Sequence, residues 1–206
     1  MTIANQAYKY RQIVNEYFEK TADDTAPRYA AISEFGFRGA QGQEGAVLTS
    51  SAFLTSFAKT ATIPAILYLE DYYNGTLENA SLGAGMISTE HSVMCSNFAV
   101  DNDEATFVKR LLSEIYPTEN VSMVSDSYDY WNMIENILSR EDIKTLIQTR
   151  KGALFVRGDS GNPVDIICGT DNSSELNRTS AIKGTVEALW DEFGGYINSK
   201  GYKVLN

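Results

Sequence analysis

The sequence contains few of the residues that mark specialised classes of protein. Its 206 residues include two cysteines, one histidine and four prolines. Cys95 and Cys168 lie among mostly apolar neighbours in the chain, so we expect both to stay reduced. No set of cysteines and histidines has zinc spacing, and neither a Walker phosphate loop nor a Rossmann glycine fingerprint is present. We therefore assign no metal-ligand residues.

Positive charge is also scarce. The chain has 17 lysines and arginines against 27 aspartates and glutamates, a net charge of −10. This balance argues against a nucleic-acid surface, but a few local cations still allow an anionic small molecule to bind. No apolar run approaches the length of a membrane span, and residues 1–6 lack the apolar core of a signal peptide. We expect a soluble, cytoplasmic protein with no nucleic-acid or membrane partner.

The apolar segments that are present alternate between strand-like and helix-like patterns. Predicted strands cover residues 30–34, 53–57, 85–88, 121–125, 153–157 and 203–205. Predicted helices lie between them, the last over 181–197. This alternation is typical of a parallel sheet covered by helices, and we expect the strand 153–157 to be buried on both faces. A regular barrel has eight strands and about 250 residues, so we predict an α/β fold that is an incomplete TIM-like barrel, with residues 1–206 as one partial domain.

Charged and polar side chains follow the predicted strands. In parallel sheets these carboxyl ends form the rim where ligands bind. Singly, each residue is more often part of an ordinary ion pair or a structural histidine, but four loops place such groups at one rim. The arginines and the histidine suit a phosphate or pyrophosphate, and the carboxylates suit ribose hydroxyls or Mg²⁺. The candidates are Phe35, Arg38, His91, Asp126, Asp129, Arg157 and Asp159.

Five motifs in the same order resemble those of the nicotinamide phosphoribosyltransferase family. They are Phe35-Gly36-Phe37-Arg38-Gly39, Glu90-His91-Ser92, Val124-Ser125-Asp126-Ser127-Tyr128-Asp129, Arg157-Gly158-Asp159-Ser160-Gly161-Asn162-Pro163 and Asn198-Ser199-Lys200-Gly201-Tyr202-Lys203. The resemblance extends over essentially the whole chain. It implies a dimeric, barrel-type pentosyltransferase, longer than this chain, that acts in NAD salvage. The implied reaction moves phosphoribose from phosphoribosyl pyrophosphate to nicotinamide, giving nicotinamide mononucleotide and pyrophosphate, with Mg²⁺ and with ATP as a coupled phosphoryl donor.

The resemblance also implies roles for the charged candidates. Arg38, His91 and Arg157 would contact pyrophosphate or phosphate, and His91 matches the histidine that the family phosphorylates with ATP. Asp159 would bind near the nicotinamide and ribose, and Asp126 would orient the surrounding polar groups. These roles are chemically consistent, because a pyrophosphate leaving group needs cations and a developing oxocarbenium ion needs nearby negative charge.

The implied nicotinamide-binding residues include two departures from the family pattern. Phe35 would be one side of the aromatic sandwich around the ring. Ala61 occupies the position of a carboxylate that accepts a hydrogen bond from the nicotinamide amide, and alanine lacks that acceptor. Gly158, in the segment expected to bind substrate, replaces the usual proline.

Three interpretations follow from these motifs and departures. The first is the central fragment of a nicotinamide phosphoribosyltransferase, inactive alone because the family's N-terminal part and C-terminal phosphate loops are absent, and working as a homodimer or with a complementing chain. The second is a non-catalytic or decayed partner subunit. The third is the related nicotinate phosphoribosyltransferase, whose acid substrate does not need the lost amide acceptor.

Overall fold

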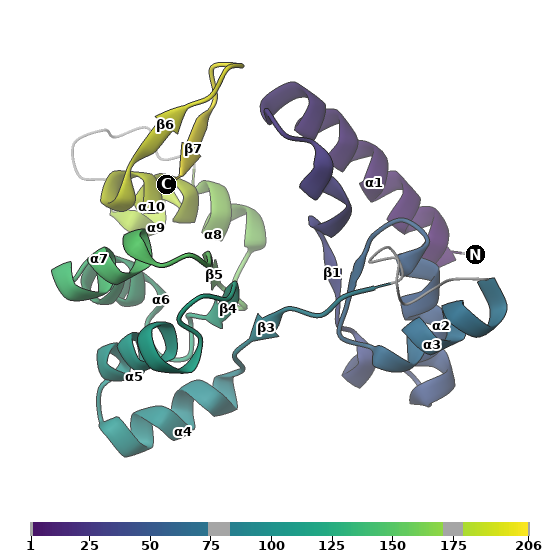
Figure 1. Cartoon of the computed structure of the whole chain (residues 1–206), viewed down its shortest axis with the longest axis horizontal. Helices are drawn as coiled ribbons and strands as arrows, with labels where there is room; N and C mark the ends of the chain where they lie inside the picture. The colour runs from purple at the N-terminus through teal and green to yellow at the C-terminus, as the bar shows by residue number, and fades with distance from the viewer. Residues whose placement is uncertain (1, 74–82, 171–178, 206) are drawn as a thin grey trace. The chain divides into compact units, whose positions relative to one another are not determined.

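The chain divides into two compact units that we describe separately. The computed structural model describes residues 2–73, 83–170 and 179–205 (Figure 1). Unit 1 comprises Met1–Met86 and Ile197–Tyr202, and unit 2 comprises Ile87–Tyr196 and Lys203–Asn206. The α/β class and the parallel strands are confirmed. The described strands form separate sheets of two, three and two strands, so the barrel stays a prediction.

Within the described ranges, no helix combines the length and the apolarity needed to cross a membrane. Cys95 and Cys168 are both free and both exposed.

Unit 1 is built from helices around one short pair of strands. In that pair, β1 and β2 run parallel with Glu34 opposite Thr60. Leu54, Ala65 and Leu69 form a small buried cluster between the helices. The elements are α1 (Thr2–Thr21), single 3₁₀ turns at Ala26–Ala30 and Phe37–Gly39, β1 (Ser33–Glu34), α2 (Gly42–Leu54), β2 (Lys59–Thr60) and α3 (Ile63–Tyr73).

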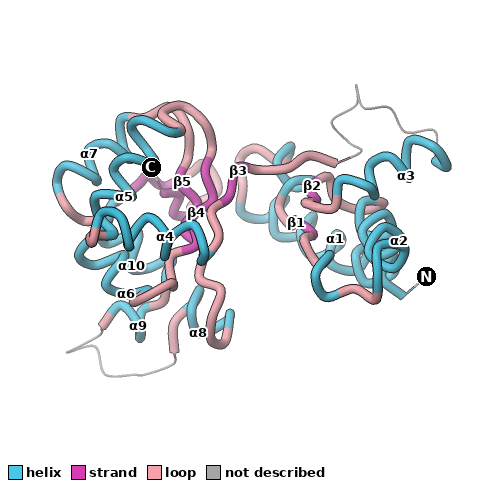
Figure 2. Tube along the Cα trace, turned by 90° about the horizontal axis from the view of Figure 1, so that it is seen from below, coloured by secondary structure: helices cyan, strands magenta, loops and turns pink. Residues whose placement is uncertain are grey.

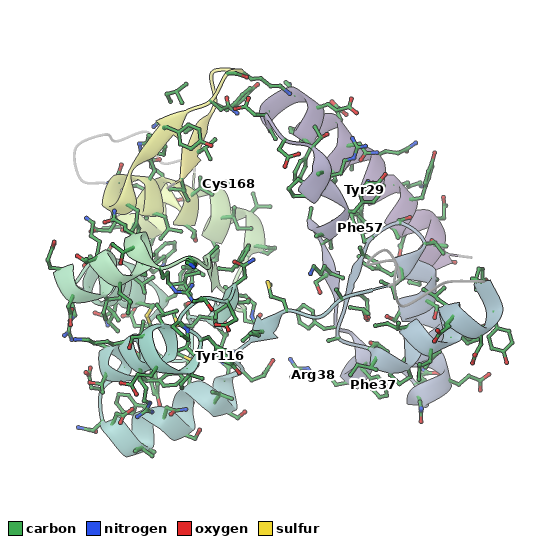
Figure 3. All side chains as sticks on the ribbon, viewed as in Figure 1. Tyr29, Phe37, Arg38, Phe57, Tyr116 and Cys168 are labelled. Carbon is green, nitrogen blue, oxygen red and sulfur yellow. The ribbon has the colours of Figure 1, made fainter. Side chains whose placement is uncertain are left out.

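The predicted strand at 53–57 is wrong. Phe53 belongs to α2, and the backbone amides of Ser56 and Phe57 both donate to its carbonyl oxygen in a closing turn. The rings of Phe53 and Phe57 stack with centroids 5.0 Å apart, a contact one helical turn allows. Phe57 is buried, and the Arg11 guanidinium lies 3.4 Å from the Tyr29 ring centroid and 5.8 Å from that of Phe57 (Figure 3). The apolar run therefore serves helix packing rather than a sheet.

The fifth sequence motif forms the tip of a hairpin between β6 (Gly195–Ile197) and β7 (Lys203–Leu205). The Asn198 side-chain amide donates to the Thr21 carbonyl (2.6 Å), and the Lys200 ammonium donates to the Glu19 carbonyl (2.5 Å). The last carbonyl groups of a helix have no partner within the helix, so these donors cap α1. Residues 198–202 of the motif thus have a structural role inside unit 1.

Unit 2 contains a three-stranded parallel sheet in the order β3-β4-β5. The central strand β4 is buried throughout, and helices pack around the sheet in Figure 2. The elements are β3 (Ile87–Ser88), α4 (His91–Asp101), α5 (Glu104–Arg110), a π-helical turn (Leu111–Ile115), β4 (Val121–Val124), α6 (Tyr130–Asn132), a second π-helical turn (Met133–Leu138), α7 (Glu141–Thr149), β5 (Leu154–Arg157), α8 (Pro163–Cys168), α9 (Ser180–Lys183) and α10 (Thr185–Phe193).

Two expectations for unit 2 are corrected. β5 is the outer strand of the described sheet and is only partly buried, with Phe155 47% exposed, so it is not covered on both faces. The predicted helix at 181–197 breaks at Gly184, whose φ is +81°. A Cβ atom there would lie 2.2 Å from the Gly169 backbone nitrogen, so only glycine allows this close approach. The result is two helices, α9 and α10, and the second ends at Phe193, because Gly195–Ile197 forms β6.

Arg150 joins the segments that precede β4 and β5. Its guanidinium donates to the carbonyl oxygens of Gly152 (2.6 Å), Tyr116 (2.6 Å) and Glu119 (2.8 Å). A Cβ atom on Gly152 would lie 2.0 Å from the Glu119 carbonyl oxygen, so these two segments are in close contact. The amino ends of the two strands are therefore held by one cation.

The N-cap of α5 provides a test of local stability. Asp103 accepts hydrogen bonds from the amides of Ala105 (3.2 Å) and Thr106 (3.0 Å) and from the Thr106 hydroxyl (2.6 Å). Asp103→Ala is expected to lower the free energy of unfolding by about 1 kcal/mol, whereas Asp103→Asn keeps a capping oxygen and should lose much less. Urea denaturation at neutral pH measures both. Equal losses in the two variants would contradict the capping role.

Candidate active site

The carboxyl ends of β3, β4 and β5 bring four of the predicted residues together in unit 2. Val124 of β4 pairs with Arg157 of β5, so the residues that follow each strand leave the sheet side by side. Asp126 and Asp159 each lie two residues beyond this pair. His91 begins α4 shortly after β3 ends. The structure thus brings His91, Asp126, Arg157 and Asp159 together at one end of the sheet in unit 2.

His91 lies among oxygen atoms from two strand ends. Its Nδ1 is 3.0 Å from the Ser127 hydroxyl oxygen. Its Nε2 is 3.4 Å from Asp159 Oδ2 and 3.9 Å from Asp126 Oδ1. The side chain is 40% exposed, so solvent or a ligand can reach the ring. One nitrogen is oriented by a hydroxyl while the other faces two carboxylates.

Arg157 spreads its guanidinium across the end of β3. Nη1 donates to the Ser88 hydroxyl (3.0 Å) and Nη2 to the Thr89 carbonyl (3.4 Å). Nε lies 3.4 Å from Asp159 Oδ1, and Nη2 lies 3.7 Å from Glu90 Oε1. The guanidinium is therefore held in place from several sides, as a cation that positions an anionic ligand must be.

Asp126 is the buried carboxylate of the cluster, with a side chain only 7% exposed. Its Oδ2 accepts from the Asp159 amide (3.0 Å). Burial by itself would raise the pKa of Asp126, but hydrogen bonds from Ser160 and from the Asp159 amide, with the charge of His91, lower it below its ordinary value. Oδ1 has no hydrogen-bond partner among the described residues. The carboxylate is thus ionised, and its Oδ1 is buried with His91 Nε2 3.9 Å away.

A cavity of about 390 Å³ opens beside this cluster and includes Gly158. A Cβ atom on Gly158 would lie 3.2 Å from two ring atoms of Tyr130 and 3.2 Å from Ile166, so the ring occupies space that a larger residue would need. The Tyr130 hydroxyl bonds to Thr185 (2.8 Å), which fixes the ring. A larger residue at this position would therefore require the Tyr130 ring or the Ile166 side chain to shift. The lining residues are Asp126, Tyr128, Tyr130, Gly158, Ser160, Gly161 and Ile166.

Asp129, also in unit 2, caps α6 instead of joining the cluster, because its side chain accepts a hydrogen bond from the Asn132 amide (3.0 Å). Phe35, Arg38 and Ala61 belong to unit 1. Phe35 follows β1 and is 50% exposed, and Arg38 lies in the turn Phe37–Gly39 (Figure 3). Ala61 follows β2, and its amide donates to the Glu34 carbonyl (2.9 Å). Phe35 and Ala61 thus lie on loops that leave two neighbouring parallel strands.

Some residues of the site were missed in the sequence. Ser88, Thr89 and Ser127 contact Arg157 or His91, and Glu34 bonds across the loops of unit 1. Ser127 lies inside a recognised motif, so its position was an available signal. No sequence signal marked Ser88 and Thr89, because short polar residues beside a weakly predicted strand are typical of any loop.

The lowered pKa of Asp126 predicts the pH dependence of stability. A carboxyl whose folded-state pKa is depressed stabilises the fold above the unfolded value of about 3.9, and this contribution is lost as pH falls through the folded value. Asp126→Asn should therefore be less stable than wild type near neutral pH. It should also lose less unfolding free energy than wild type between about pH 6 and about pH 3.

The control for this experiment is Asp71→Asn, at an exposed position on α3 with no hydrogen bond to a described residue. Its pH dependence should follow wild type. If the free energy of unfolding of Asp126→Asn depended on pH as that of wild type does, the charge of Asp126 would contribute nothing to folding.

The chain is similar to known proteins over its whole length. The model of the Nicotinate phosphoribosyltransferase (NAPRTase) family matches residues 30–205. Proteins named nicotinamide phosphoribosyltransferase are 37% identical over 209 residues in Acinetobacter baylyi, 32% over 205 in Mycoplasma pneumoniae and 28% over 207 in Xanthomonas campestris pv. campestris. Each match covers 100% of this chain and 40%, 41% and 40% of the respective relative, so the chain spans about two fifths of their length. Because the family model matches most of the residues, this chain belongs to the nicotinate phosphoribosyltransferase family.

Proposed function

We propose that the chain is part of a pentosyltransferase of NAD salvage. The reaction transfers phosphoribose from phosphoribosyl pyrophosphate to nicotinamide, giving nicotinamide mononucleotide and pyrophosphate. The observation that carries this proposal is the cluster of His91, Asp126, Arg157 and Asp159 at the carboxyl ends of parallel strands. The relatives named nicotinamide phosphoribosyltransferase support the choice of substrate.

The charges of the cluster suit the two halves of this reaction. Breaking the bond between ribose and pyrophosphate leaves positive charge on the sugar and negative charge on the leaving group. Arg157 would bind the pyrophosphate, and the carboxylates of Asp126 and Asp159 would lie near the oxocarbenium-like sugar. Groups already held in position stabilise developing charge without rearrangement during the reaction.

The same carboxylates fit a magnesium ion. Asp126 Oδ1 is buried without a hydrogen-bond partner in the described part of the chain, and Mg²⁺ commonly uses one or two carboxylates together with substrate phosphates. Among the described residues, no three His, Cys, Asp or Glu side chains are grouped to hold a metal ion alone. Asp126 and Asp159 would hold the ion together with the substrate. When bound, Mg²⁺ neutralises charge on the pyrophosphate.

His91 is the proposed acceptor of phosphate from ATP. A ring nitrogen would form a bond to the γ-phosphorus, the bond from that phosphorus to the bridging oxygen would break, ADP would leave, and the proton lost by the ring would pass to solvent. The Ser127 hydroxyl at Nδ1 orients the ring, which leaves Nε2 on the side of the two carboxylates. The exposed ring agrees with this assignment.

The pyridine ring would bind at the loops of unit 1. Phe35 is half exposed and offers an aromatic face, which suits a second copy of the chain or a complementing chain that supplies the opposite side. Arg38 would contact phosphate. The incomplete TIM-like barrel expected from the sequence is also part of this proposal.

Nicotinate is the second candidate substrate. Ala61 has no side-chain acceptor for the amide of nicotinamide, and a carboxylate substrate needs none. Parallel titrations with nicotinamide and nicotinate decide between the two. Tighter binding of nicotinate would assign the chain to the acid-specific reaction.

Arg157 provides the main test of the phosphate site. Arg157→Ala should weaken pyrophosphate binding by about 1.5–3 kcal/mol, since a hydrogen-bonded charged contact is lost. This corresponds to a rise in Kd of roughly 10- to 150-fold in isothermal titration calorimetry.

Lys109→Ala is the matched control, because it removes one exposed positive charge from α5, outside the cluster. Its Kd should equal that of wild type. Unchanged binding in Arg157→Ala would make Arg157 part of a structural ion pair, and no binding by wild type would favour the non-catalytic partner subunit.

His91 is tested by transfer of labelled phosphate. His91→Ala should abolish incorporation from γ-labelled ATP, whereas Ser127→Ala keeps the imidazole and should retain part of it. Incorporation is followed by autoradiography after brief ATP exposure, and acid treatment should remove the label because it hydrolyses the phosphorus–nitrogen bond of phosphohistidine. Label that persists in His91→Ala would assign the acceptor to another residue.

A further inference from the structure

Glu34 connects the two loops of unit 1 that carry Phe35 and Ala61. It is the last residue of β1 and lies opposite Thr60 of β2. Its main-chain carbonyl accepts from the Ala61 amide (2.9 Å). Its side-chain Oε1 accepts from the Gly36 amide (2.7 Å). One residue therefore holds the start of both loops.

The second carboxylate oxygen of Glu34 completes this connection. Oε2 accepts from the hydroxyl groups of Thr60 (2.9 Å) and Thr62 (3.0 Å). The Thr60 oxygen in turn bonds to the Ser50 hydroxyl (2.8 Å) and accepts from the Thr62 amide (2.9 Å). The carboxylate thus reaches from the loop after β1 to the loop after β2 and on to helix α2.

This network is buried on the side of its donors. Ser50, Thr60 and Thr62 are 0%, 3% and 1% exposed. Burial raises the pKa of Glu34, but the hydrogen bonds from Ser50, the Gly36 amide, Thr60 and Thr62 outweigh it and lower the pKa below its ordinary value. The group is ionised at neutral pH, and a buried hydroxyl left without this acceptor would be costly.

The residues beside Glu34 contrast with it. Phe35 is half exposed, and Ala61 is exposed and has no side-chain hydrogen-bonding group. The hydrogen bonds of Glu34 therefore supply an anchor directly beneath the surface where the pyridine ring is proposed to bind.

We propose that Glu34 is a positioning residue for the pyridine substrate, because its carboxylate holds the Phe35 and Ala61 loops in the arrangement that binds the ring. This proposal rests on the proposed function. Glu34 does not touch the ring; it fixes the distance between the aromatic face of Phe35 and the backbone around Ala61. Small displacements of such groups reduce affinity strongly, since binding depends on preorganised geometry.

The experiment compares Glu34→Ala, Glu34→Gln and Thr62→Val with wild type in the 206-residue chain. Nicotinamide and nicotinate are titrated by calorimetry, and pyrophosphate is titrated separately as a probe of unit 2. For the pyridine that wild type binds, we expect Kd to rise about tenfold in Glu34→Ala, the effect of one lost charge-assisted hydrogen bond, and less in Glu34→Gln. Pyrophosphate Kd should not change in any variant.

Hydrogen exchange provides a second readout that needs no substrate. Amides at 36 and 60–62 should exchange faster in Glu34→Ala and Thr62→Val, while those of β4 should match wild type. Thr62→Val keeps the carboxylate and the nearly equal side-chain volume, so it tests the network if Glu34→Ala does not fold. Glu44→Gln, on the first turn of α2, is the matched control for loss of one carboxylate.

The outcomes separate the two proposals. Wild-type pyridine affinity in Glu34→Ala and Thr62→Val overturns the positioning role and leaves the proposed function intact. Absence of pyridine binding in wild type overturns both the ring-binding function and the positioning role. A parallel rise in pyrophosphate Kd would also overturn the positioning role, because it would show general damage to the fold.

Discussion

The register of β4 against β5 determines where the charged groups of unit 2 lie. Val124 pairs with Arg157, and β4 and β5 both end at this pair. The bond from the Asp159 amide to Asp126 Oδ2 continues this alignment beyond the last strand pair. A shift of one residue would move Arg157 to the other face of the sheet and separate the cluster. The chemistry of the site therefore depends on backbone hydrogen bonds between two four-residue strands.

Opposite charges within the cluster stabilise one another while leaving capacity for a ligand. Arg157 is held by Ser88, Thr89, Glu90 and Asp159, so its guanidinium keeps its orientation before any anion arrives. Asp126 is buried and ionised, a costly state that its hydrogen-bond donors offset. Groups fixed in this way lose little entropy when a substrate binds.

Much of the architecture could be predicted from the sequence because the apolar pattern reflects burial. The strand 121–124 is continuous in apolar residues apart from Ser122, and it became the buried centre of the sheet. The run at 53–57 has the same composition but ended a helix, because the contact between Phe53 and Phe57 suits helical spacing equally well. The break at Gly184 follows from its contact with Gly169, which is distant in sequence and invisible to any local pattern.

The candidate site was predictable where charge follows a strand and unpredictable where it does not. His91, Asp126, Arg157 and Asp159 met at one edge, as parallel strands require. The role of Glu34 depends on three hydroxyl groups that come together only after β1 and β2 pair, so neither its charge nor its neighbours in the sequence revealed it.

The guanidinium of Arg150 has a consequence for how this fold tolerates change. It binds three carbonyl oxygens at the amino ends of β4 and β5, opposite the end that carries the reactive groups. The amino ends of these strands are thus held by contacts separate from the candidate site. Substitutions in the loops at the carboxyl ends leave the Arg150 contacts in place, so part of what holds the sheet together is independent of the residues that face a ligand.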